Sequence, residues 1–149
     1  RAHLNYYLNK IDSQGNEDGI TKKIYDAFTL GRAAIVAKDY DERDKQAAIV
    51  AAEISKVVGY KAFYYIEKGS GYISEGKWAA AHHALSEAYG FILGMQFTKA
   101  ADGEPYMTNG EVNTMLDALA AGNGFWDRTP AELDDMAAQL KTATGLSSP

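Results

Sequence analysis

The stretch WAAAHHALSEAYGFILGMQFT, residues 78–98, decides the fold that we predict for this chain. It contains no Lys or Arg and one acid, Glu87, among Ala, Leu, Ile, Phe, Met and Tyr. Its apolar residues recur at steps of three and four on more than one side, which is helical spacing. A helix that is apolar on several sides is buried on several sides. We therefore predict that residues 74–97 form the buried central helix of a helical bundle.

Composition narrows the classes of protein to consider. A chain of 149 residues fits a single domain with its own core, so we predict one helical domain over residues 1–149. The net charge of −5 argues against a nucleic-acid partner. The absence of Cys excludes disulfides, thiolate metal sites and thiol nucleophiles. Polar residues interrupt the central stretch too often for a transmembrane segment.

The rest of the chain also carries helical periodicity. Asp41 is the predicted N-cap of a long helix that should end at Gly69. Thr108 and Thr129 each precede a Glu by three residues, which is the capping-box signature of a helix start. No segment alternates with period two, so we predict an all-α bundle of about five to six helices. The other predicted helices cover residues 2–10, 20–38 and 41–68.

The first residues, RAHLNYY, show no initiator Met, charged leader or apolar leader. We therefore expect the chain to be a processed or excised piece of a longer protein. A second copy of the chain is one expected partner.

His83 and Glu87 form the first candidate site. They are four residues apart, so on a helix they lie on the same face. One hypothesis is a metal site, because imidazole and carboxylate together suit zinc or iron. The other is a buried His–Glu hydrogen bond that satisfies two polar groups in the core. A closed site needs roughly three or four ligands, so spacing alone leaves both hypotheses open.

Four further residues are weaker candidates. His82 points about 100° away from His83 on a helix. Ser86 lies within a turn of both histidines, but no nucleophile elbow surrounds it, and we name no catalytic residue. Trp126 and Asp127 lie between two predicted helices, where we expect Trp126 to plug the end of the bundle and Asp127 to assist the next cap.

Several of these segments together resemble an uncharacterised bacterial domain family related to the imelysin-like envelope proteins. The resemblance rests on HALSEAYGFI at residues 83–92, QFT at 96–98, GNGFWD at 122–127, NYYLNK at 5–10 and GRAAIVAKDYDERD at 31–44. It implies an all-helical fold and a secreted or envelope location, in the periplasm or on a lipid anchor at the surface. It also implies that the chain is the C-terminal portion of such a protein, so that the missing N-terminal half is a further expected partner. Some imelysin-like relatives are linked to iron uptake or peptidase activity and carry a Gly-x-His-x-x-Glu motif. Here Ala81 stands two residues before His83, and Glu87 is four residues beyond it, so the motif itself is not present.

Three hypotheses of function follow. The first is a non-enzymatic envelope or secreted module for binding or scaffolding, because no complete catalytic constellation is present. The second is a protein that binds iron or zinc, with His83 and Glu87 as ligands. The third is a subunit of a self-assembling extracellular structure, with apolar helix faces completed by another copy.

Overall fold

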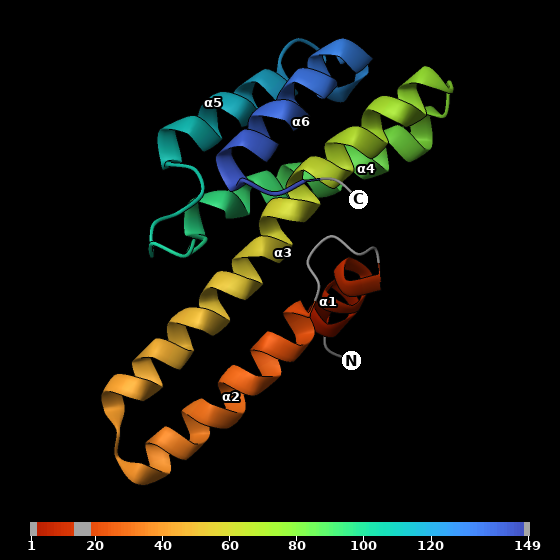
Figure 1. Ribbon diagram of the computed structural model, residues 1–149. Coiled ribbons are helices and arrows are strands. Elements are labelled where there is room, and N and C mark those ends of the chain that lie inside the picture. The colour runs from red at the N-terminus through yellow and green to blue at the C-terminus, as the bar shows by residue number, and fades with distance from the viewer. Residues whose placement is uncertain (1–2, 14–18, 148–149) are drawn as a thin grey trace. The chain divides into compact units, whose positions relative to one another are not determined.

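The computed structural model describes residues 3–13 and 19–147, and all regular structure among them is helical (Figure 1). This confirms the all-α prediction. The described helices are α1 (His3–Ser13), α2 (Ile20–Ala37), α3 (Tyr40–Ser74), α4 (Trp78–Gly94), α5 (Asn109–Ala120) and α6 (Pro130–Thr144), with the short 3₁₀ helices η1 (Met95–Phe97) and η2 (Gly124–Asp127).

The long helix α3, rather than the stretch predicted as the centre, is the element on which the other helices pack. Our prediction ended this helix at Gly69, but it runs on to Ser74. Gly69 does not end the helix. It is a packing position instead, since a Cβ there would lie 2.5 Å from Leu85 Cδ2 on α4. The stretch predicted as central forms α4 and η1, and its helix begins four residues later than predicted, after a turn at Gly76 with φ +70°.

The described chain divides into two compact units, and α3 contributes to both. Unit 1 comprises Arg1–Val57 with Thr98–Glu104, and unit 2 comprises Val58–Phe97 with Pro105–Ser148. Whether they act as the single domain that we predicted stays a prediction.

In unit 1, α2 and the first half of α3 form an antiparallel hairpin (Figure 1). Gly31 allows the two helices to approach closely, since a Cβ on it would lie 3.3 Å from Gln46 Cβ. The N-cap of α3 is Asp39, whose Oδ1 accepts a hydrogen bond from Glu42 N at 3.0 Å, and not the predicted Asp41. Asp41 lies inside the helix, in its first turn.

In unit 2, the second half of α3 packs with α4 and α6. Ser70 Oγ on α3 donates to Asp134 Oδ1 on α6 at 2.7 Å, and Lys141 on α6 forms an ion pair with Glu67 on α3. Lys61 is 1 % exposed, with its Nζ 4.3 Å from the centroid of the Tyr64 ring. The core of the unit is apolar and includes Phe63, Ile66, Leu85, Ile92, Leu119, Leu133 and Leu140.

Both predicted capping boxes are present. Thr108 starts α5 by accepting from Glu111 N, and Thr129 starts α6 by accepting from Glu132 N, while each Glu side chain bonds back to its cap residue. Pro130 holds the first position of α6, and Gly145 ends this helix in the left-handed conformation, φ +67°. These local signals fix where α5 and α6 begin and where α6 ends, and the two helices lie side by side in unit 2 (Figure 1). No helix in the described part of the chain combines the length and apolar character needed to cross a bilayer.

Candidate functional site

The predicted pair on α4 is not a buried pair. His83 is exposed and Glu87 is only partly buried, so the hypothesis of a core hydrogen bond between them is wrong. The physical reason is that Ala81, Ala84, Leu85 and Ala88 supply the buried side of α4, which turns His83 outward. Among residues 3–13 and 19–147, no three His, Asp or Glu side chains gather in a group that could hold a metal ion. Iron or zinc binding by His83 and Glu87 stays a prediction.

Ser86 is also exposed, and its hydroxyl donates to His83 O at 2.8 Å within the same helix. This is local bonding to the backbone of the preceding turn. It gives Ser86 no geometric relation to an imidazole side chain.

His82 and Trp126, by contrast, are brought together from α4 and η2. Their ring centroids lie 3.9 Å apart with the rings at 82°, an edge-to-face contact. Trp126 does not plug the bundle end as predicted: it is 66 % exposed. The reason is that η2 has no buried residue of its own, so the ring lies over His82 at the surface.

Asp127 closes the turn before it and does not cap α6. Its carboxylate accepts hydrogen bonds from Asn123 N at 2.8 Å and from Asn123 Nδ2 at 3.2 Å. Both hydrogen bonds lower the pKa of Asp127, the one from the Asn123 backbone more than the one from its side chain. A Cβ added to Gly122 would lie only 2.3 Å from Asp127 Oδ2, and Gly122 has φ +67°. The role predicted for Asp127 in the following cap is therefore wrong, since Thr129 and Glu132 cap α6 on their own.

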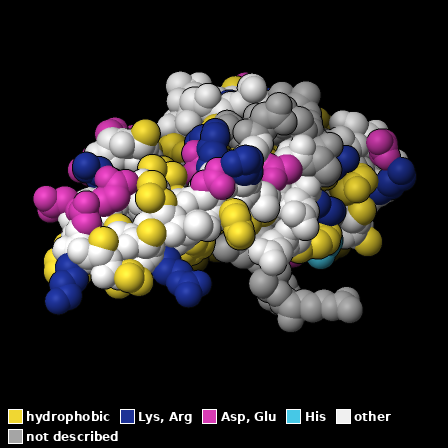
Figure 2. Space-filling model, turned by 60° about the horizontal axis from the view of Figure 1, so that its bottom comes forward, with side chains coloured by type: hydrophobic (Ala, Val, Ile, Leu, Met, Phe, Trp, Pro, Cys, Tyr) yellow, Lys and Arg dark blue, Asp and Glu magenta, His cyan; other side chains and the backbone are white. Residues whose placement is uncertain are grey.

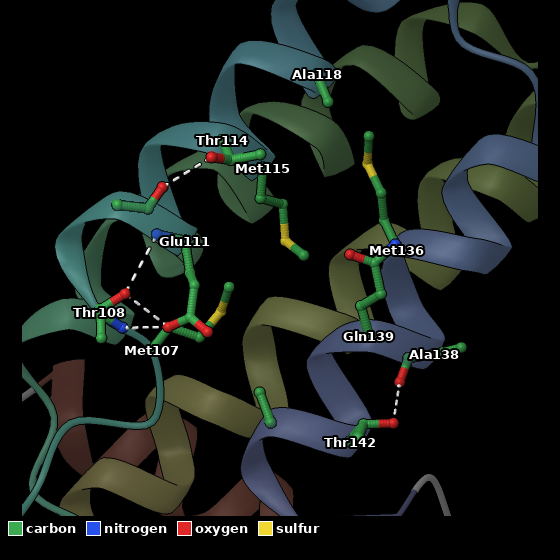
Figure 3. A pocket seen from close by; sticks show the side chains of 12 residues that line it. Met107, Thr108, Glu111, Thr114, Met115, Ala118, Met136, Ala138, Gln139 and Thr142 are labelled. Carbon is green, nitrogen blue, oxygen red and sulfur yellow. Dashed lines mark hydrogen bonds between the residues drawn. The ribbon is translucent and has the colours of Figure 1, made fainter.

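A groove of about 1100 Å³ lies between α5 and α6 in unit 2, and we call it the methionine groove. Three of the four methionines of the chain line it: Met107, Met115 and Met136. Figure 3 shows Met115 from α5 and Met136 from α6 extending into the space between the two helices. All three are less than 9 % exposed, so they form the floor of the groove rather than its edge. Thr108, Glu111, Thr114, Gln139 and Thr142 bring polar side chains to it.

The acidic groups around this groove have defined roles. Glu111 Oε2 accepts from Thr108 N at 2.8 Å and from Thr108 Oγ1 at 2.7 Å (Figure 3). Both hydrogen bonds lower the pKa of Glu111, the one from the Thr108 side chain more than the one from its backbone. On the helix surface, exposed Asp117 follows Thr114 by one turn, and exposed Asp135 precedes Gln139 by one turn.

The basic groups near α5 and α6 are already engaged. Residues 109–144 contain six acids and two bases, Arg128 and Lys141. Arg128 donates to Ala118 O at 2.8 Å and to Ala121 O at 3.1 Å, and Lys141 is paired with Glu67. The charge left uncompensated around the groove is therefore negative.

Sequence reasoning did not identify the methionine groove. It predicted no site role for Met107, Met115 or Met136. The signal was available as three methionines within residues 107–136, but periodicity cannot tell the floor of a groove from a closed core.

Comparison with known proteins gives a family and no further relative. No curated protein and no solved structure matches this chain. Residues 1–147 match a family described as a domain of unknown function (DUF4856), a match that does not show a relation to the imelysin-like proteins. The chain therefore belongs to the DUF4856 family.

Proposed function

We propose that this protein is a non-enzymatic binding module whose methionine groove takes a basic amphipathic helix of a partner protein. The observation that carries the proposal is the convergence of Met107, Met115 and Met136 on one open groove. Methionine side chains are unbranched and polarizable, so they adapt to apolar side chains of different shapes. A groove between two helices is a common docking site for an amphipathic helix.

The negative charge around the methionine groove favours one kind of helix as the partner. Glu111 lies in the groove, and Asp117 and Asp135 lie beside it. Because the two nearby bases are occupied, an approaching helix with Lys or Arg beside its apolar stripe meets complementary charge. An acidic helix would meet repulsion.

A suitable probe is a 15-residue Leu/Lys peptide designed as an amphipathic helix. A scrambled peptide of the same composition keeps the charge but loses the apolar stripe. We expect the amphipathic peptide to bind at least about tenfold more tightly in titration calorimetry. Equal binding of the two peptides would show that only charge is recognised and would overturn the proposal.

Two variants locate the binding site. Thr114→Arg places a bulky cation in the groove, and Asn113→Arg places the same charge at an exposed position of α5 that does not line it. We expect the first variant to lower affinity for the amphipathic peptide at least about tenfold and the second to change it about twofold or less. Equal effects of both variants would contradict binding in the groove.

An envelope or secreted location, implied by the imelysin resemblance, stays a proposal. Fractionation of the native cells tests it, with the cytosolic fraction as the contradicting result. The expectation that the protein binds no nucleic acid rests on its negative charge, and a filter-binding assay with duplex DNA tests it.

A further inference from the structure

A second pocket in unit 2 is built from aromatic rings and shares no residue with the methionine groove. Its volume is about 470 Å³, and His82, Tyr89, Phe125 and Trp126 line it. Trp78 lies beyond His82, with ring centroids 6.4 Å apart. Trp126 is 66 % exposed and Tyr89 38 %, so these rings are accessible to a ligand. We call this the aromatic pocket.

The aromatic pocket offers few hydrogen bonds. Among the described residues that line it, the polar groups are the imidazole of His82, the hydroxyl of Tyr89 and the amide of Asn123, and Asn123 Nδ2 already donates to Asp127 Oδ1. His82 Nε2 is buried and has no hydrogen-bond partner in the described structure. A sugar or a polar metabolite would leave most of its own polar groups unpaired there, which is costly.

The electrostatic environment favours a cation. The faces of aromatic rings are negative, and Trp is the strongest of them. Within the described part of the chain, no Lys or Arg lines the pocket. Asp127, a carboxylate, follows Trp126 directly, and its hydrogen bonds from Asn123 lower its pKa below the ordinary value. Arg128, the next cation along the chain, is held by the carbonyls of Ala118 and Ala121.

We propose that the aromatic pocket binds a quaternary ammonium group. A trimethylammonium group matches these features because it is cationic, has an apolar surface and donates no N–H hydrogen bond. This inference goes beyond the proposed function and does not depend on the methionine groove.

The test compares choline with its neutral isostere, 3,3-dimethylbutan-1-ol, on the full chain by titration calorimetry. The two probes have the same shape and differ in charge. We expect choline to bind about two- to fivefold more tightly, which is the discrimination that an exposed cation–π site provides. Equal affinities, or no binding of choline at millimolar concentration, would overturn the proposal.

A pair of variants assigns the effect to the pocket. Trp126→Leu removes the exposed ring, and Phe97→Leu removes another exposed ring that does not line the pocket. We expect the first to lower choline affinity at least about tenfold and the second to leave it unchanged, with both unfolding at temperatures close to wild type. Unchanged choline binding in folded Trp126→Leu would contradict the assignment.

The same chemistry could be presented by a lipid headgroup or by a modified protein. Phosphatidylcholine vesicles and a peptide containing trimethyllysine separate these sources, with phosphatidylglycerol vesicles and the unmethylated peptide as controls. Tighter binding of either probe than of its control supports the proposal and names the source. Failure of both probes, together with failure of choline, overturns it.

Discussion

Gly69 and Gly71, near the C-terminal end of α3, lie in opposite packing environments. A Cβ on Gly69 would lie 2.5 Å from Leu85 Cδ2, and Leu85 is fully buried, whereas a Cβ on Gly71 meets no atom within 4 Å. We therefore expect Gly69→Ala to destabilise the protein by about 1–3 kcal/mol through overpacking. Gly71→Ala should stabilise it by roughly 0.5–1 kcal/mol, because Ala is the better helix former. Urea denaturation of both variants tests this, and equal effects would contradict the close approach of α3 and α4.

Glu87 illustrates a residue whose burial was mispredicted. Because it is only partly buried, Glu87→Ala should change the free energy of unfolding by about 0.5 kcal/mol or less. Leu85→Ala on the same helix is the control, with an expected loss of about 2–5 kcal/mol, because Leu85 is fully buried. A loss of free energy of unfolding as large as that in Leu85→Ala would show that Glu87 has a role in the core, contrary to the structure.

At the scale of the element, the capping boxes are local devices with separable effects. Thr129→Ala removes the side-chain acceptor for Glu132 N and should cost about 1 kcal/mol. Thr142→Ala, at an exposed position late in the same helix, should cost less than about 0.5 kcal/mol. Thermal unfolding of both variants measures the difference, and equal losses would show that the cap is not formed in solution.

The same capping box predicts a dependence of stability on pH. Hydrogen bonds from Thr129 N and then from Thr129 Oγ1 lower the pKa of Glu132 below its ordinary value of 4.5. The unfolded chain then binds the proton more tightly than the folded chain does. The contribution of Glu132 to the free energy of unfolding is therefore fully present above pH 4.5 and is lost as the pH falls through the lower folded-state pKa. Glu132→Gln should therefore flatten the loss of stability in acid, and Asp135→Asn, outside the box, should flatten it less. Identical acid profiles for the two variants would contradict this coupling.

How far these elements could be predicted depends on how local their causes are. The starts of α5 and α6 were predicted correctly, because a capping box involves residues within four positions of one another. The end of α3 was not, because Gly69 is a turn signal in sequence and becomes a packing position only when Leu85 on α4 is placed against it. The contact of His82 with Trp126 was missed for the same reason, although both had been selected as candidates.

At the scale of the whole molecule, apolar side chains reach the surface between charged ones on the face shown in Figure 2. In unit 1, Phe28 is 61 % exposed and Ile35 54 %, and both line a hollow of about 340 Å³ between α2 and α3. Assembly with another copy, one of the hypotheses drawn from the sequence, stays a prediction. We expect light scattering to give a mass above the 16.2 kDa of one chain.

The combined change Phe28→Asp with Ile35→Asp should return the mass to that of one chain, because it places charges on the apolar face. Thr29→Asp, on an exposed position of α2 that does not line the hollow, should leave the assembly intact. A wild-type protein that is monomeric at high concentration would rule out self-assembly through this face.

The central claim is that the methionine groove is a binding surface for a basic amphipathic helix. Labelling of the methionine methyl groups with ¹³C tests it most directly, because the chain has four methionines and three of them line the groove. On adding the Leu/Lys peptide, we expect the methyl resonances of Met107, Met115 and Met136 to shift. The resonance of Met95, which is buried outside the groove, should stay in place. Shifts of all four resonances together, or of none, would contradict the claim.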